Sequence, residues 1–177
     1  MLLGCKRSWL LGGTNRYNQE EALEIKKLLI DIASKLTPEK SKEIAVITPC
    51  SAQKKLLRKI INDLKDRGQI QNLQIKCDTV DSFQGQEADI VIYSCVRTDG
   101  SLSFLIDKKR LNVALSRVRE NLFIVGHKDF LYNAKVEGKE IIKKLLNAVH
   151  RVCYKHKTQG FWGIILNLSF HYSINDL

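Results

Sequence analysis

The hydrophobic and polar positions of this chain follow two periods, one typical of helices and one typical of buried strands. Over residues 18–36, apolar side chains recur at three- and four-residue steps, which predicts an amphipathic helix. Asn18 is its expected N-cap, and Glu21 lies where a capping box places an acid. The same period predicts a second helix over residues 51–66, which Gly68 ends.

Short apolar runs lie between the helical segments and predict strands. The predicted strands cover residues 44–47, 73–80, 89–96 and 121–126. Further helices are expected over residues 107–119, 128–132 and 136–149. Several of these strands are continuously apolar, which is typical of a parallel sheet buried on both faces. The pattern therefore predicts an α/β fold, in which a parallel sheet is sandwiched between helices.

Ligands of such sheets bind beyond the carboxyl ends of the strands. The loops expected to carry function are therefore residues 48–50, 81–87 and 97–103.

Composition adds a preference for polyanions. Lysine and arginine total 29 against 19 aspartates and glutamates, a formal net charge of +10. This surplus favours nucleic acid or an acidic membrane surface, and a generally basic soluble protein is the alternative. The five cysteines are scattered, without C-x-x-C pairs, so we expect reduced thiols, no disulfide framework and no metal site. No stretch approaches the roughly 20 apolar residues of a membrane span, so cytoplasm or nucleus is the expected compartment.

The segment TVDSFQGQEAD, at residues 79–89, is the first that suggests chemistry. Gly85 permits a backbone conformation or a close approach that a side chain would block. The hydroxyls of Thr79 and Ser82 suit phosphate oxygens, and Glu87 can accept a hydrogen bond from a sugar hydroxyl. The alternative is an ordinary polar connection between two strands.

A second segment, RLNVALSRVR at residues 110–119, combines an apolar helical stripe with three arginines. Arg110, Arg117 and Arg119 project from the rest of the predicted helix. Arginine suits a transferring phosphoryl group because its planar fork stays charged and offers several donors. The alternative is a solvated basic face.

The third segment runs from the strand at residues 44–47 into the helix at residues 51–66. A helix N-terminus attracts anions through its free amides and its dipole, and Gln53 or Lys54 can face a phosphate there. Simple capping of the helix by Ser51 is the alternative.

Together, the three segments resemble motifs IV, V and VI of the superfamily-1 helicases, in the branch of the nonsense-mediated-decay helicase and senataxin. The strings that match are ITPCSAQ at residues 47–53, TVDSFQGQE at 79–87 and RLNVALSRVR at 110–119. The resemblance implies a RecA-like second motor domain over residues 14–150, preceded by an extension over residues 1–13. Residues 151–177 form a tail of uncertain structure: a disordered extension, an extra edge element or a product of imperfect gene modelling.

The resemblance also implies roles for individual residues. Arg117 would be the arginine finger at the γ-phosphate, and therefore catalytic. The implied nucleotide-binding residues are Gln53, Lys54, Gly85, Glu87 and Arg119. The residues implied to face the single strand are Thr48, Thr79, Ser82 and Arg97, mainly through phosphate and sugar. Such contacts give sequence-tolerant, salt-sensitive binding.

The 177 residues contain no G-x-x-x-x-G-K-[ST] string and no Asp-Glu pair after an apolar strand. The expected fold is therefore of the P-loop NTPase type without its own P-loop. ATP and Mg²⁺ would bind only when a first RecA-like domain, in cis or in trans, completes the cleft. We expect single-stranded RNA or DNA as a partner, no membrane, and weak or no ATP hydrolysis by the isolated chain. The alternative is a non-catalytic module, derived from a helicase, that binds nucleic acid or protein.

Overall fold

The computed structural model describes residues 16–37, 39–83, 86–98 and 118–127, with the backbone of two short strands at 153–154 and 165–169. Gly85 and Arg117 lie outside these residues, and so do the helices predicted over 128–132 and 136–149.

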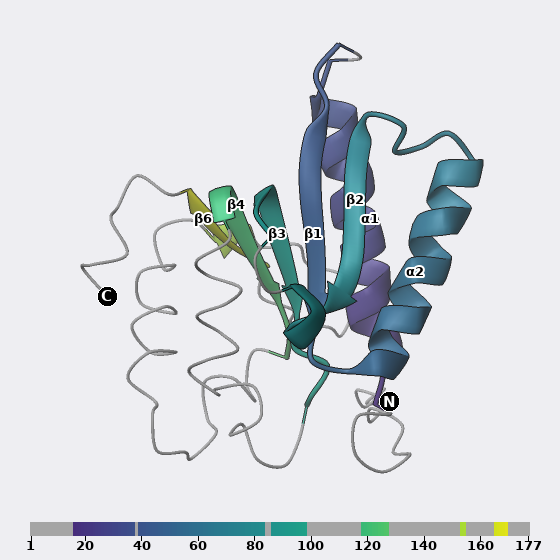
Figure 1. Ribbon diagram of the computed structural model, residues 1–177, viewed down its shortest axis with the longest axis vertical. Helices are drawn as coiled ribbons and strands as arrows, with labels where there is room; N and C mark the ends of the chain where they lie inside the picture. The colour runs from purple at the N-terminus through teal and green to yellow at the C-terminus, as the bar shows by residue number, and fades with distance from the viewer. Residues whose placement is uncertain are drawn as a thin grey trace, which may run out of the picture.

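A six-stranded sheet forms the centre of the described structure, in the order β2-β1-β3-β4-β6-β5 (Figure 1). Its parallel strands are β1 (Lys42–Thr48), β2 (Leu73–Thr79), β3 (Ala88–Ser94) and β4 (Val118–Val125). Two antiparallel strands, β6 (Ile165–Ser169) and β5 (Cys153–Tyr154), extend the sheet beyond β4. The predicted α/β fold with a parallel sheet is confirmed.

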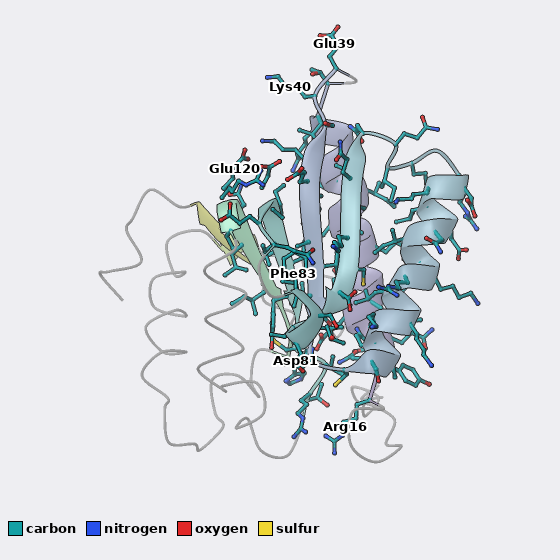
Figure 2. All side chains as sticks on the ribbon, viewed as in Figure 1. Arg16, Glu39, Lys40, Asp81, Phe83 and Glu120 are labelled. Atoms are coloured by element: carbon teal, nitrogen blue, oxygen red, sulfur yellow. The ribbon has the colours of Figure 1, made fainter. Side chains whose placement is uncertain are left out.

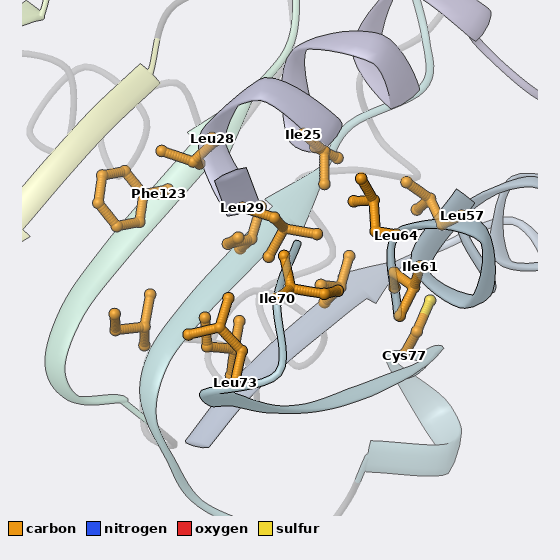
Figure 3. Packing of buried hydrophobic residues seen from close by; sticks show 14 of the residues in the cluster. Ile25, Leu28, Leu29, Leu57, Ile61, Leu64, Ile70, Leu73, Cys77 and Phe123 are labelled. Atoms are coloured by element: carbon orange, nitrogen blue, oxygen red, sulfur yellow. The ribbon is translucent and has the colours of Figure 1, made fainter. Parts of the chain in front are cut away.

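Two helices, α1 (Gln19–Lys35) and α2 (Ser51–Asp66), cover one face of the sheet (Figures 1 and 3). Leu29 of α1 and Leu57 of α2 are both fully buried in the core that they form with the sheet. Complete burial of such a side chain stabilises the fold by about 1.5–3 kcal/mol. Ala45, Val91 and Leu122, on the opposite face, are also fully buried, so the strands are buried on both sides. None of the helices within the described ranges is long and apolar enough to cross a bilayer.

One predicted boundary is wrong. Val118 and Arg119 were predicted as the end of a helix over residues 107–119, but they begin β4, three residues before the predicted strand. The reason is a long-range contact, because Val118 pairs with Ala88 at the start of β3 and is drawn into the sheet. The strand pairs in the tail were also not predicted, and they match the extra-edge alternative for residues 153–154 and 165–169.

The two helices begin differently. The side chain of Asn18 accepts a hydrogen bond of 3.1 Å from the amide of Glu21, so the predicted cap of α1 is confirmed. Helix α2 has Cys50 as its N-cap and no hydrogen bond from a capping side chain, while Ser51 is already helical. The alternative that Ser51 caps this helix is therefore wrong. Without a capping side chain, the first amides of α2 keep their attraction for an anion.

Gly68 ends α2 in a left-handed conformation, with φ at +70°. Its amide donates to the carbonyl of Lys65 at 2.9 Å, and the amide of Gln69 donates to the carbonyl of Leu64 at 3.0 Å. This pair of bonds is the Schellman arrangement, which glycine adopts most easily.

We expect Gly68→Ala to destabilise the chain by about 1 kcal/mol, since a side chain makes positive φ unfavourable. An added Cβ would meet only the side chain of Gln71, at 3.4 Å or more, so the expected loss comes from backbone strain. Urea denaturation of Gly68→Ala and Gly68→Asn tests this. Asparagine tolerates positive φ better and should lose less stability. An alanine variant as stable as the unsubstituted chain would contradict this account of the helix end.

Candidate functional site

The predicted site residues are divided between two opposite edges of the parallel sheet. At the carboxyl edge, Thr48, Thr79 and Ser94 end β1, β2 and β3. At the amino edge, β1, β3 and β4 begin. Figure 2 labels Asp81 near the first edge and Glu120 near the second. A seven-residue strand such as β1 separates the two edges by about 20 Å, at the usual rise of about 3.3 Å per residue.

The four residues predicted to face nucleic acid share the carboxyl edge. The hydroxyls of Thr79 and Ser82 lie 3.0 Å apart, and Ser82 is exposed. Arg97, just beyond β3, is half-buried. Thr48 is fully buried, and its hydroxyl accepts a long bond of 3.5 Å from the amide of Cys50. The edge therefore presents two hydroxyls and a guanidinium near the surface, with Thr48 beneath them.

Gln53, predicted to contact a nucleotide, is fully buried in this structure. Its side-chain oxygen accepts a 2.7 Å bond from the amide of Asn18. Its side-chain nitrogen donates to the carbonyl of Asn18 at 3.2 Å and to the hydroxyl of Ser94 at 3.1 Å. Gln53 thus joins α2 to the start of α1 and the end of β3.

Lys54, the next residue, is paired with an acid of the same edge. Its ammonium lies 3.1 Å from Asp78 of β2, and Arg58 lies 3.0 Å from the other oxygen of that carboxylate. Burial alone would raise the pKa of Asp78, but the amide of Thr79 and the two cations outweigh it and lower the pKa. A phosphate that binds Lys54 must therefore compete with Asp78.

A buried polar network, which the sequence did not predict, ties the start of α1 to the end of β3. One carboxyl oxygen of Glu21 accepts bonds from the Ser94 hydroxyl at 2.7 Å and the Val96 amide at 2.8 Å. Asn18 donates from its side chain to the other oxygen of Glu21 and to the carbonyl of Val96, both at 3.3 Å. We call Asn18, Glu21, Gln53, Ser94 and Val96 the polar bridge.

A signal for the polar bridge was present in the sequence. Glu21 shares the helical face of Ala22, Ile25 and Leu29, the apolar stripe of α1. Helical periodicity thus placed an acid among core residues, where it needs hydrogen-bond partners. Burial raises the pKa of Glu21 to about 8, although the bonds from Val96 and Ser94 act in the opposite direction.

Glu87 and Arg119 come together at the amino edge. The guanidinium of Arg119 lies 3.6 Å from Glu87, 3.1 Å from Asp89 and 3.0 Å from Glu43. Desolvation alone would lower the pKa of Arg119, but the carboxylates of Glu43 and Asp89 together outweigh it and raise the pKa. The predicted nucleotide-binding residues that the structure describes therefore form two groups, Glu87 with Arg119 here and Gln53 with Lys54 at the carboxyl edge.

The register of the sheet relates Glu87 to the second motif. Ala88, which follows Glu87, pairs with Val118, which follows Arg117 in the sequence. A hollow of about 530 Å³ opens beside Glu87, lined by β1, β2, Lys65 of α2, Phe83 and residues 86–88.

Comparisons with known proteins agree on one family. Residues 4–129 match the sequence profile of a family described as "AAA domain". The putative ATP-dependent RNA helicase ECM32 of Saccharomyces cerevisiae is 35% identical over 72% of this chain and 14% of its own length. Helicase SEN1 of the same yeast is 34% identical over 67% of this chain and 5% of its own length. An uncharacterized ATP-dependent helicase of Methanocaldococcus jannaschii is 37% identical over 72% of this chain and 17% of its own length.

This chain thus spans a small part of each of these relatives. Among solved structures, a ribosomal protein L11 methylase from Lactobacillus delbrueckii superposes with a TM-score of 0.45 at 10% identity, over 88% of this chain and 81% of that chain. That similarity is too weak to identify a fold or a function.

Proposed function

This chain belongs to the superfamily-1 helicases of the nonsense-mediated-decay helicase and senataxin type, and on that premise we propose that it is their second RecA-like motor domain. Its role would be to supply one wall of an ATP cleft and part of a single-strand track. The division of the predicted residues between two edges supports this proposal. The carboxyl edge holds hydroxyls and a guanidinium that suit a strand, together with Gln53 and Lys54, and the amino edge holds Glu87, which we propose faces the nucleotide.

The observation that carries the nucleotide half of the proposal is the pairing of Ala88 with Val118. Parallel strands in this register start at one edge, so the segments that bear Glu87 and Arg117 lead into neighbouring strands. We propose that Arg117 reaches the γ-phosphate as an arginine finger and that Glu87 contacts the ribose. Arg119 would hold Glu87, Glu43 and Asp89 in place. To contact the nucleotide itself, it would have to break its ion pair with one of these carboxylates.

Mg²⁺ does not fit the described part of this chain. Among those residues, no group of three or more His, Cys, Asp or Glu side chains can hold a metal ion. The metal and the phosphate cradle would come from a first RecA-like domain, and the complete enzyme would hydrolyse ATP on RNA or DNA in the cytoplasm or nucleus.

The strand half of the proposal is supported by Thr79, Ser82 and Arg97. Hydroxyl and guanidinium donors of this kind suit the phosphates and sugars of a backbone, and they do not distinguish bases. Gln53 is buried, so we propose that it acts through the segments it bonds.

A non-catalytic binding module is the second candidate. The net charge of +10 and the pairing of Lys54 with Asp78 favour it, since the charge suits polyanions while Lys54 is already engaged.

The test mixes this chain with a separately prepared first RecA-like domain of a relative, ATP, Mg²⁺ and single-stranded oligonucleotide. We expect ATP hydrolysis that requires both proteins and rises with oligonucleotide. The chain alone should bind the oligonucleotide with an affinity that falls as the salt concentration rises. Each phosphate contact should add about 0.7 to the slope of the logarithm of the binding constant against the logarithm of the salt concentration. Binding without hydrolysis in any mixture would favour the module, and absence of both would contradict the two candidates.

A further inference from the structure

Val96 has a backbone conformation that points to function. It is fully buried and is the one non-glycine residue with positive φ, 68°, in the described part of the chain. This conformation costs a β-branched residue about 1–3 kcal/mol, so it persists only where surrounding groups fix it. The polar bridge does so, because Glu21 accepts from the amide of Val96 and Asn18 donates to its carbonyl.

The consequence of this turn is the position of Arg97. Immediately after Val96, the amide of Arg97 bonds back to the carbonyl of Cys95 at 2.8 Å. The chain therefore leaves β3 in a tight turn, and Arg97 is placed at the carboxyl edge.

The same bridge positions a second arginine, Arg16, which no motif singled out. Gln53 holds both the amide and the carbonyl of Asn18, two residues after Arg16. Arg16 lies near the carboxyl edge in Figure 2. Its backbone is hydrogen-bonded to the thiol of Cys50.

The electrostatics of Cys50 agree with this placement. Burial raises the pKa of the Cys50 thiol, and the charges of Arg97 and Arg16 act against that rise. The two segments are about 80 residues apart in the sequence, and they meet directly, because the side chain of Asn18 donates to the carbonyl of Val96 at 3.3 Å.

A helix end adds to the positive potential at this point. Helix α2 starts directly after Cys50, with no capping side chain and no acid in its first turn. Glu21 is close by, but it is largely protonated at neutral pH because burial raises its pKa to about 8. Among the other acids of this edge, Asp78 is already paired with Lys54 and Arg58, and Asp81 is exposed to solvent.

We propose that Arg16 and Arg97 form a paired site for one phosphodiester of a single nucleic-acid strand, and that Glu21 and Gln53 are the positioning residues that hold the pair. This inference rests on the proposed function, because it assumes that the strand follows the carboxyl edge. It adds Arg16 to the proposed binding residues and assigns the polar bridge the role of positioning both arginines.

The first test measures binding of a fluorescent single-stranded oligothymidylate by anisotropy at several salt concentrations. We expect Arg16→Ala and Arg97→Ala each to weaken binding roughly tenfold and to reduce the salt slope by at most about 0.7, the value for one complete phosphate contact. Because the two arginines share a phosphate, the double variant should lose less than the product of the single losses. The control, Lys27→Ala, removes one exposed charge from α1 and should leave the slope nearly unchanged.

The second test concerns the positioning residues. Glu21→Gln keeps an oxygen for the amide of Val96, so it should bind the oligonucleotide nearly as well as the unsubstituted chain. Glu21→Ala removes that acceptor and should bind about as weakly as Arg97→Ala. If Glu21 acts through Arg97, the double variant Glu21→Ala/Arg97→Ala should bind the oligonucleotide little more weakly than either single variant. If Glu21→Ala only destabilised the fold, the two losses of affinity would add. Circular dichroism establishes that each variant is folded.

The outcomes separate the two proposals. If the unsubstituted chain binds with a steep salt dependence but Arg16→Ala and Arg16→Lys change neither affinity nor slope, the paired site is wrong and the proposed function stands. If the unsubstituted chain does not bind the oligonucleotide at any salt concentration, both proposals are overturned.

Discussion

Replacing Arg117 by alanine is expected to lower ATP hydrolysis by roughly three to five orders of magnitude when this chain is combined with a first RecA-like domain. An arginine finger acts on the charge that develops on the transferring phosphoryl group. Its guanidinium can donate two parallel hydrogen bonds while it stays charged. Steady-state release of phosphate, measured at saturating oligonucleotide, gives the magnitude.

Two variants show whether this loss belongs to the transition state. Arg117→Lys keeps the charge without the planar fork, so we expect activity between that of the alanine variant and the unsubstituted chain. Lys27→Ala, in which an exposed lysine of α1 is removed, should hydrolyse ATP normally. Binding of the oligonucleotide should be nearly equal in all of them, because the strand is proposed to lie at the other edge. Turnover that survives Arg117→Ala would contradict the motor assignment.

The fold could be predicted from sequence wherever local periodicity and burial agree. Apolar residues of α1 and α2 recur at helical steps, and β1 and β3 each contain a continuous apolar run, so their approximate positions followed from the pattern. The start of β4 was predicted too late because Val118 is fixed by Ala88, a residue 30 positions away in the sequence. Strand β6 was missed for the same reason, since its partner is β4 and its own sequence lacks periodicity.

The candidate site was predictable by residue but only partly by contact. Glu21 was expected to complete a capping box, and the local part is confirmed, because Asn18 does accept from its amide. The carboxyl of Glu21 instead bonds Ser94 and Val96, more than 70 residues away. The prediction for Gln53 failed in the same way. Its place in the first turn of α2 suggested a contact with phosphate, but in the fold its side chain bonds to the backbone of Asn18. Local patterns identify polar residues, and only the tertiary structure identifies their partners.

Stability should fall as pH rises from about 5 to 8, and Glu21 should be a main cause. The pKa of its carboxyl group is about 8 in the folded chain, against 4.5 as the ordinary value. Between these two values, the unfolded chain releases a proton that the folded chain keeps, so rising pH favours unfolding. The stability that comes from the raised pKa of Glu21 is fully present below pH 4.5 and is lost as pH rises to about 8. The slope is at most about 1.4 kcal/mol per pH unit.

The physical reason is a competition within the polar bridge. Ser94, Val96 and Asn18 donate three hydrogen bonds to the carboxyl group, and these bonds favour its charged form. Complete burial of Glu21 disfavours that form, and here it has the larger effect. A neutral carboxyl group can still accept bonds from these donors without the desolvation of a charge.

Glu21→Gln tests this balance, since glutamine is neutral at every pH and nearly the same shape. The free energy of unfolding, from urea denaturation followed by circular dichroism at pH 5.5, 6.5 and 7.5, should depend on pH less steeply in this variant. Relative to the unsubstituted chain, the variant should gain stability as pH rises. Glu39→Gln makes the same chemical change at an exposed position and should leave the slope unchanged. Equal slopes for Glu21→Gln and the unsubstituted chain would mean that the buried carboxyl group is already ionised, and that the three donors outweigh its burial.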